Sequence, residues 1–105
     1  AHIASERRIV IGPVVLDSNT YTVSRGEQVL ELPKKEFELL YKLLSYPGQI
    51  FTRNQLLDDI WGFDSESGED TVKTHISRLR NKLRAIEEFR IITIKGLGYK
   101  AEVLE

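Results

Sequence analysis

The 105-residue sequence contains no cysteine, no methionine, one tryptophan and two histidines. Without cysteine the chain has no disulfide, no thiolate nucleophile and no cysteine-ligated zinc. Because the two histidines, His2 and His75, lie far apart in the sequence, we expect neither a metal nor a cofactor. No stretch approaches the roughly 20 apolar residues of a membrane span, and residues 1–8 lack the apolar segment of a signal peptide. We therefore expect a cytoplasmic chain without membrane contact, in which residues 1–8 are a linker or an artificial tail.

The remaining composition is that of one small globular domain, which we place at residues 9–105. Hydrophobic residues make up 41% and charged residues 30% of the chain, as in ordinary folded domains. The net charge of -1 conceals an asymmetry along the chain. Residues 1–68 carry seven Lys/Arg and ten Asp/Glu, whereas residues 69–105 carry eight and six. A surface for an anionic partner is therefore expected in the C-terminal third.

Short β-branched stretches fill the first third of the chain. They lie at residues 9–11, 14–16, 21–23 and 29–32. Pairs typical of turns separate them, such as Gly12-Pro13. The pattern predicts an antiparallel β-meander.

Two helices are predicted next. The first covers about residues 34–46 and begins after Pro33, whose fixed ring geometry takes the place of a side-chain cap. The second begins after Thr52, which forms the Thr-x-x-Gln pattern of a capping box with Gln55. Gly62 suits the position just beyond the end of this second helix.

A third helix, predicted for residues 70–86, has one apolar stripe and one polar face. The stripe falls within an arc of roughly 60° and consists of Val72, Ile76, Leu79 and Leu83. The opposite face has small or hydrogen-bonding side chains at its centre: Asp70, Thr74, Ser77, Arg78 and Asn81. Bases flank that centre: Lys73, Arg80 and Arg84 on one side, His75 and Lys82 on the other. Such a face suits the DNA major groove, although charges that only keep a helix soluble give a similar pattern.

The last segment predicts a β-hairpin. Residues 91–94 and 99–103 are apolar or alternating, and a glycine-containing turn separates them. Two helices, a basic helix and a hairpin in this order describe a winged helix-turn-helix. We therefore expect an α+β fold with an N-terminal β-meander, three helices and a C-terminal hairpin wing.

Five motifs follow one another along the chain: EFELL at 36–40, FTRNQLL at 51–57, IWGF at 60–63, TVKTHISRLRNKL at 71–83 and GLGY at 96–99. In this order they resemble the effector domain of OmpR/PhoB-type response regulators. The resemblance covers about residues 9–103. It implies sequence-specific binding of double-stranded promoter DNA within a two-component system that controls transcription.

The resemblance also implies roles for individual residues. Thr74 and Arg78 match positions that contact base edges, and Lys95 at the hairpin tip matches the residue that enters the minor groove. Positions expected to contact DNA phosphates are Arg53, Trp61, Lys73, His75, Ser77, Arg80, Thr93 and Tyr99. Three residues of the 62–68 loop match a segment that contacts RNA polymerase in some family members: Phe63, Asp64 and Glu66. Trp61 has an alternative role, as part of the core between the second and third helices.

Two departures from the family pattern lower the expected affinity. Asp70 and Ser77 stand where a base is common, and each lost phosphate contact weakens binding. We therefore expect a weakly binding monomer that pairs on DNA. We expect a receiver domain in the whole protein that is missing from this chain, and we expect phosphorylation to act through it. A winged helix that binds protein instead of DNA remains open, whereas an enzyme is not expected, because His75 has no nucleophile at a recognisable spacing.

Overall fold

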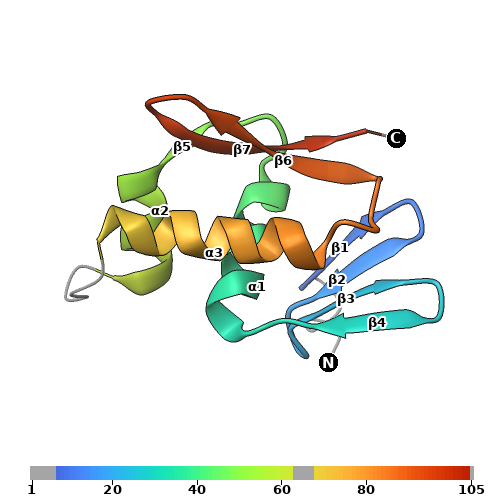
Figure 1. Ribbon diagram of the computed structural model, residues 1–105. Helices are drawn as coiled ribbons and strands as arrows, with labels where there is room; N and C mark the ends of the chain where they lie inside the picture. Colours follow the sequence, from blue (N-terminus) through green and yellow to red (C-terminus); the bar gives the residue numbers. More distant parts are fainter. Residues whose placement is uncertain (1–6, 63–67, 105) are drawn as a thin grey trace.

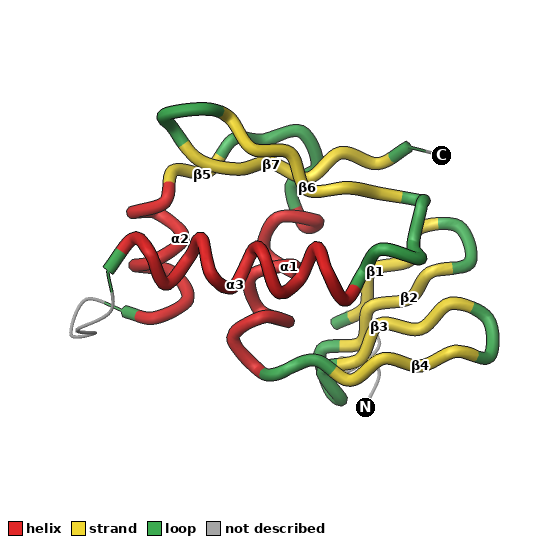
Figure 2. The backbone as a smooth tube through the Cα atoms, in the orientation of Figure 1, coloured by secondary structure: helices red, strands yellow, loops and turns green. Residues whose placement is uncertain are grey.

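The computed structural model describes residues 7–62 and 68–104 (Figure 1). The elements are β1 Arg8–Ile11, β2 Val14–Asp17, β3 Thr22–Arg25, β4 Gln28–Glu31, α1 Lys34–Ser45, β5 Phe51–Thr52, α2 Arg53–Trp61, α3 Glu69–Lys82, β6 Phe89–Ile94 and β7 Gly98–Val103. They confirm the expected α+β order, and β1 begins one residue before the expected start of the domain. Two antiparallel sheets, β1-β2-β3-β4 and β5-β7-β6, flank the helices (Figure 2). Within the described ranges, no helix has the length and apolar character needed to span a bilayer.

The predicted meander forms the four-stranded sheet, and its pleat alternates inward and outward side chains. Leu16 and Val23 are paired across β2 and β3 and are buried, whereas Val10 and Val29 lie on the outer face and are each 65% exposed. This alternation is typical of an antiparallel sheet with one face on the core. Tyr21, expected in the third strand, instead precedes β3 with φ of 56°. Its left-handed backbone turns the chain out of the extended conformation before β3, its carbonyl oxygen accepts from Leu32 N–H at 3.0 Å, and its ring lies 5.5 Å from that of Phe37.

The start and end of α2 follow the local sequence closely. Gln55 N–H donates to the Thr52 hydroxyl at 3.1 Å, and Thr52 N–H donates to the Gln55 side chain at 2.8 Å. The capping box is thereby confirmed, and it satisfies two backbone donors that the first turn leaves without helical partners. At the other end Gly62 has φ of 88°, a conformation that strains residues with a Cβ.

The apolar stripe of α3 is buried as predicted, but the helix is shorter than expected. Its stripe residues Val72, Ile76 and Leu79 are at most 1% exposed. The helix ends at Lys82 instead of residue 86, and Leu83 and Ile86 form a turn through an Ile86 N–H bond to the Leu83 carbonyl. The reason is that β6 begins at the buried Phe89, so the chain needs residues 83–88 to reverse direction.

The second glycine of the 96–98 segment has a packing role that local sequence does not reveal. Gly96 has φ of 74° and lies in the hairpin turn as expected. Gly98 instead lies in β7 opposite Thr52 of β5. A Cβ on Gly98 would lie 1.9 Å from the Phe51 carbonyl oxygen. The hairpin can therefore take β5 as a third strand only because this position has no side chain.

An ion pair joins the four-stranded sheet to the segment that enters β6. Arg25 at the end of β3 donates to both carboxylate oxygens of Glu88, with distances of 2.9 Å to 3.2 Å. The hydrogen bond from Arg25 is the main cause that lowers the pKa of Glu88. The same bond is the main cause that raises the pKa of Arg25.

The pair predicts a pH-dependent contribution to stability. The pKa of Glu88 is lower in the folded chain than its ordinary value of about 4.5. The contribution of the pair to the free energy of unfolding is therefore complete above about pH 4.5 and is lost as pH falls through the pKa of Glu88 in the folded chain. Glu88→Gln should therefore lower the urea midpoint at pH 7, and the gap from wild type should close in more acidic buffer. Glu31→Gln, on an exposed residue of β4, is the control. A gap that stays constant down to pH 3 would contradict the assignment.

Candidate nucleic-acid interface

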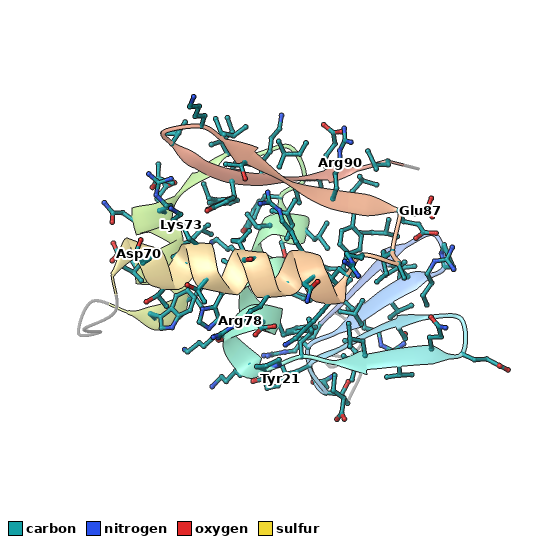
Figure 3. The ribbon with its side chains drawn as sticks, in the orientation of Figure 1. Tyr21, Asp70, Lys73, Arg78, Glu87 and Arg90 are labelled. Carbon is teal, nitrogen blue, oxygen red and sulfur yellow. The ribbon has the colours of Figure 1, made fainter. Side chains whose placement is uncertain are left out.

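The face of α3 opposite the buried stripe lies on the surface. Its central side chains, Asp70, Thr74, Ser77, Arg78 and Asn81, are all exposed, as are Lys73 and Arg80 beside them. Figure 3 places Asp70 and Lys73 near the start of α3 and Arg78 further along, on the side away from the hairpin. The helix dipole adds partial positive charge at the end where Asp70 lies. Asp70 thus lies at the end of α3 where the helix dipole stabilises a negative charge, and Arg78 and Arg80 lie further along the helix.

Three guanidinium groups gather at the C-terminal end of this face. Arg78, Arg80 and Arg84 line an open hollow of about 470 Å³ together with Ser77 and Asn81. Arg84 follows the end of the helix, so it lies beyond α3 instead of within it. A surface hollow bordered by arginines attracts anions, and guanidinium groups match phosphate in geometry as well as in charge.

Arg80 also joins α3 to the hairpin. Its Nη2 donates to the carbonyl oxygen of Ile91 at 2.8 Å and to the hydroxyl of Thr93 at 2.7 Å. Its guanidinium carbon lies 5.9 Å from the centre of the Tyr99 ring. Tyr99 is only 4% exposed, whereas Thr93 is on the surface. Three of the residues expected at phosphates, Arg80, Thr93 and Tyr99, are therefore in mutual contact.

Trp61 and His75 form a second contact, between α2 and α3. Their ring centroids lie 4.9 Å apart at an interplanar angle of 77°. The His75 Nδ1–H donates to the Thr71 carbonyl oxygen at 2.8 Å, which leaves Nε2 for another partner. Trp61 packs partly buried against the core. The structure thus gives Trp61 a packing role and orients His75 beside it.

Lys82 does not flank the polar face as an independent base, which corrects the sequence expectation. Its Nζ donates to Glu36 Oε1 at 2.7 Å, and the Glu36 side chain is only 3% exposed. The pair ties the last residue of α3 to the first turn of α1. The sequence places Glu36 four residues before Leu40 on the apolar side of its helix, but its partner lies 46 positions further along the chain.

The remaining candidate positions lie apart from α3. Arg53 is half-buried in the first turn of α2, and Lys95 is exposed in the turn between β6 and β7. The loop positions Phe63, Asp64 and Glu66 lie outside the described residues. Across the part of the chain that the structure describes, no group of three His, Cys, Asp or Glu side chains is placed to hold a metal ion.

Comparison with known families identifies the domain. The family model described as transcriptional regulatory protein, C terminal, matches residues 26–101. The chain belongs to this family. The matched region runs from the end of the meander to β7 and includes all three helices.

Individual relatives agree with this assignment. The heme response regulator HssR of Staphylococcus aureus is 40% identical over 102 residues, which are 96% of this chain and 46% of that protein. The chain thus spans about half the length of this curated relative.

Two solved structures share the fold and contain DNA. The DNA-binding domain of response regulator AdeR, in complex with an intercistronic region, has a TM-score of 0.76 at 26% identity and covers 91% of this chain and 100% of that one. The RstA DNA-binding domain of Klebsiella pneumoniae, in complex with the RstA box, has a TM-score of 0.76 at 32% identity, with coverages of 91% and 97%.

The Glu36–Lys82 contact predicts unequal effects of two lysine substitutions on α3. Lys82→Ala should lower the free energy of unfolding by about 2 kcal/mol, because it leaves the Glu36 carboxylate buried without its partner. Lys73→Ala, on the exposed face, should change it by less than about 0.5 kcal/mol. Replacing Glu36 and Lys82 together by leucine should recover most of the loss. Equal effects of the two single substitutions in urea unfolding would refute the role given to the pair.

Proposed function

We propose that this domain binds double-stranded promoter DNA as the effector domain of a two-component response regulator that controls transcription. In this proposal α3 occupies the major groove, and the β6–β7 wing reaches the adjacent minor groove. The observation that carries it is the exposed face of α3, with polar side chains and arginines over a fully buried stripe. The likeness to AdeR and RstA domains in complex with DNA supports it.

Base reading is assigned to Thr74 and Arg78. Both are exposed near the middle of α3, where a helix in the major groove comes closest to base edges. Arg78 can donate two hydrogen bonds to O6 and N7 of guanine, which lysine cannot reproduce. The Thr74 hydroxyl and methyl groups suit a shorter contact, including the methyl group of thymine.

Positioning on the backbone is assigned to the surrounding residues. Those proposed to contact phosphates are Arg53, Trp61, Lys73, His75, Ser77, Arg80, Thr93 and Tyr99. Lys95 at the tip of the wing is proposed to enter the minor groove, where a cation meets enhanced negative potential. Phosphate contacts of this kind fix orientation and register, whereas base contacts supply specificity.

The proposed partners extend beyond DNA. A receiver domain is proposed for the part of the whole protein that this chain lacks, with phosphorylation acting through it to pair two domains on DNA. In this proposal the exposed Asp70 lowers the affinity of one domain for DNA, and pairing of two domains on repeated half-sites supplies the affinity that one domain lacks. The acidic loop with Phe63, Asp64 and Glu66 is proposed to contact RNA polymerase.

DNA binding predicts a difference between two arginine substitutions of equal charge. Arg78→Ala should weaken binding to a duplex of about 30 base pairs by about tenfold and leave the slope of log affinity against log salt nearly unchanged, because Arg78 is assigned to a base edge and not to a phosphate. Arg90→Ala removes an arginine of β6 that pairs with Glu102 at 3.0 Å, away from the α3 face, and should change neither quantity. Fluorescence anisotropy at 50 to 200 mM salt measures both. If neither variant differs from a non-binding wild type, the alternative of a protein-binding winged helix takes its place.

A separate prediction concerns the acid at the start of the recognition face. Asp70→Asn should raise DNA affinity about fivefold, because an anion near phosphate costs on the order of 1 kcal/mol in water. It should also lower the free energy of unfolding by about 0.5 kcal/mol, since it removes a negative charge from a helix N-terminus. Anisotropy and urea unfolding measure the two effects, and Glu31→Gln is the control for both. A loss of affinity in Asp70→Asn would contradict the assigned geometry.

A further inference from the structure

Among the described residues, one polar side chain of α3, Arg80, hydrogen-bonds to the hairpin. The main packing partners of α3 are α1 and α2, whereas a hollow of about 200 Å³ lies between the C-terminal part of α3 and β6. Arg80 and Ile91 both line this hollow. Apolar packing therefore does not close the seam there, and the guanidinium group spans it.

The acceptors of Arg80 sit where the hairpin is best anchored. Thr93 is paired with Tyr99 across β6 and β7, and Tyr99 is paired with Phe51 of β5. β6 is an edge strand of this sheet, and edge strands leave backbone carbonyls without a ladder partner. Arg80 supplies such a donor to Ile91 while it holds the Thr93 hydroxyl. One nitrogen atom thus fixes two points of β6 relative to α3.

We propose that Arg80 is a positioning residue that sets the distance between α3 and the wing, so that α3 and Lys95 engage adjacent grooves of one duplex together. This inference rests on the proposed DNA-binding function. Both described hydrogen bonds use Nη2, and a guanidinium group carries five N–H donors. Arg80 can therefore hold the wing and still present Nη1 to a phosphate, so its geometry matters in addition to its charge.

The substitution Arg80→Lys separates the effect of the positive charge on DNA binding from the effect of the guanidinium geometry. Lysine keeps the positive charge but lacks the planar fork that reaches two acceptors at once. Arg80→Lys should therefore leave the salt slope on a 30-base-pair duplex unchanged, whereas Arg80→Ala should reduce it by about 0.9. Thr93→Val, which removes one acceptor without any change in charge, should resemble Arg80→Lys.

Coupling to the wing is measured by a double-mutant cycle. Lys95→Ala should weaken duplex binding about fivefold in the wild type but less than about twofold in the Arg80→Lys background. The reason is that Lys95 contributes less to duplex affinity when the wing is not held against α3. The matched control combines Lys95→Ala with Lys73→Ala. Lys73 is an exposed α3 residue that takes no part in the Arg80 contacts with β6, so the two effects should multiply. A Lys95→Ala effect of equal size in the wild-type and Arg80→Lys backgrounds would overturn the proposal.

Amide hydrogen exchange tests the same contact without DNA. In Arg80→Lys, amides of β6 and β7 near the turn should exchange about tenfold faster, as expected for loss of a charged hydrogen bond. Amides of the four-stranded sheet should keep their wild-type rates. Unchanged exchange in the hairpin overturns the proposal. If the wild type binds no duplex, the proposed function is wrong, and the positioning role of Arg80 is wrong with it. If the wild type binds DNA but amide exchange in the hairpin of Arg80→Lys is unchanged, only the positioning role of Arg80 is wrong.

Discussion

Burial of the α3 stripe is the constraint on which the rest of the surface depends. Val72, Ile76 and Leu79 are at most 1% exposed, and full burial of each such side chain is worth roughly 1.5 to 3 kcal/mol. That energy fixes the rotation of α3 about its own axis. A rotation by one residue, 100°, would expose part of the stripe and turn arginines toward the core, where an unpaired charge is strongly unfavourable. The recognition face is therefore determined by the core beneath it.

Apolar burial fixes which face of α3 points outward, but directional polar contacts fix how the other elements sit against it. Glu36 with Lys82 joins α1 to the end of α3. Arg80 joins the last third of α3 to β6, and Arg25 with Glu88 joins the four-stranded sheet to the segment that enters β6. These contacts all lie around the second half of α3 and the start of the hairpin. A protein that engages two grooves needs rigidity between α3 and the hairpin, because a small change in the angle between them produces a large displacement of the wing tip.

The sequence was sufficient wherever the physical cause is local. The Thr52 and Gln55 capping box, the Gly62 helix end and the α3 stripe each depend on residues within a few positions of one another, and the structure confirms all three. The errors arose where the cause is distant. The early end of α3 depends on where Phe89 enters the core, and the Lys82 contact depends on Glu36, 46 positions away. Helical periodicity places the candidate base-reading residues on an exposed face of α3. It cannot predict the two acceptors of Arg80, because they lie on another element, β6.

A net charge of -1 is compatible with DNA binding because charge acts locally. At physiological salt the Debye length is roughly 8 Å, so acids on the meander barely weaken the field at α3. Arg78, Arg80 and Arg84 lie together at one end of the recognition face, while Asp70 lies at the other, where it complements the helix dipole. The arrangement favours the helix electrostatically, and in the proposed function it also limits the affinity of one domain for DNA. In the proposed function, a second domain held nearby at high effective concentration supplies the remaining affinity, so that control of pairing is also control of DNA occupancy.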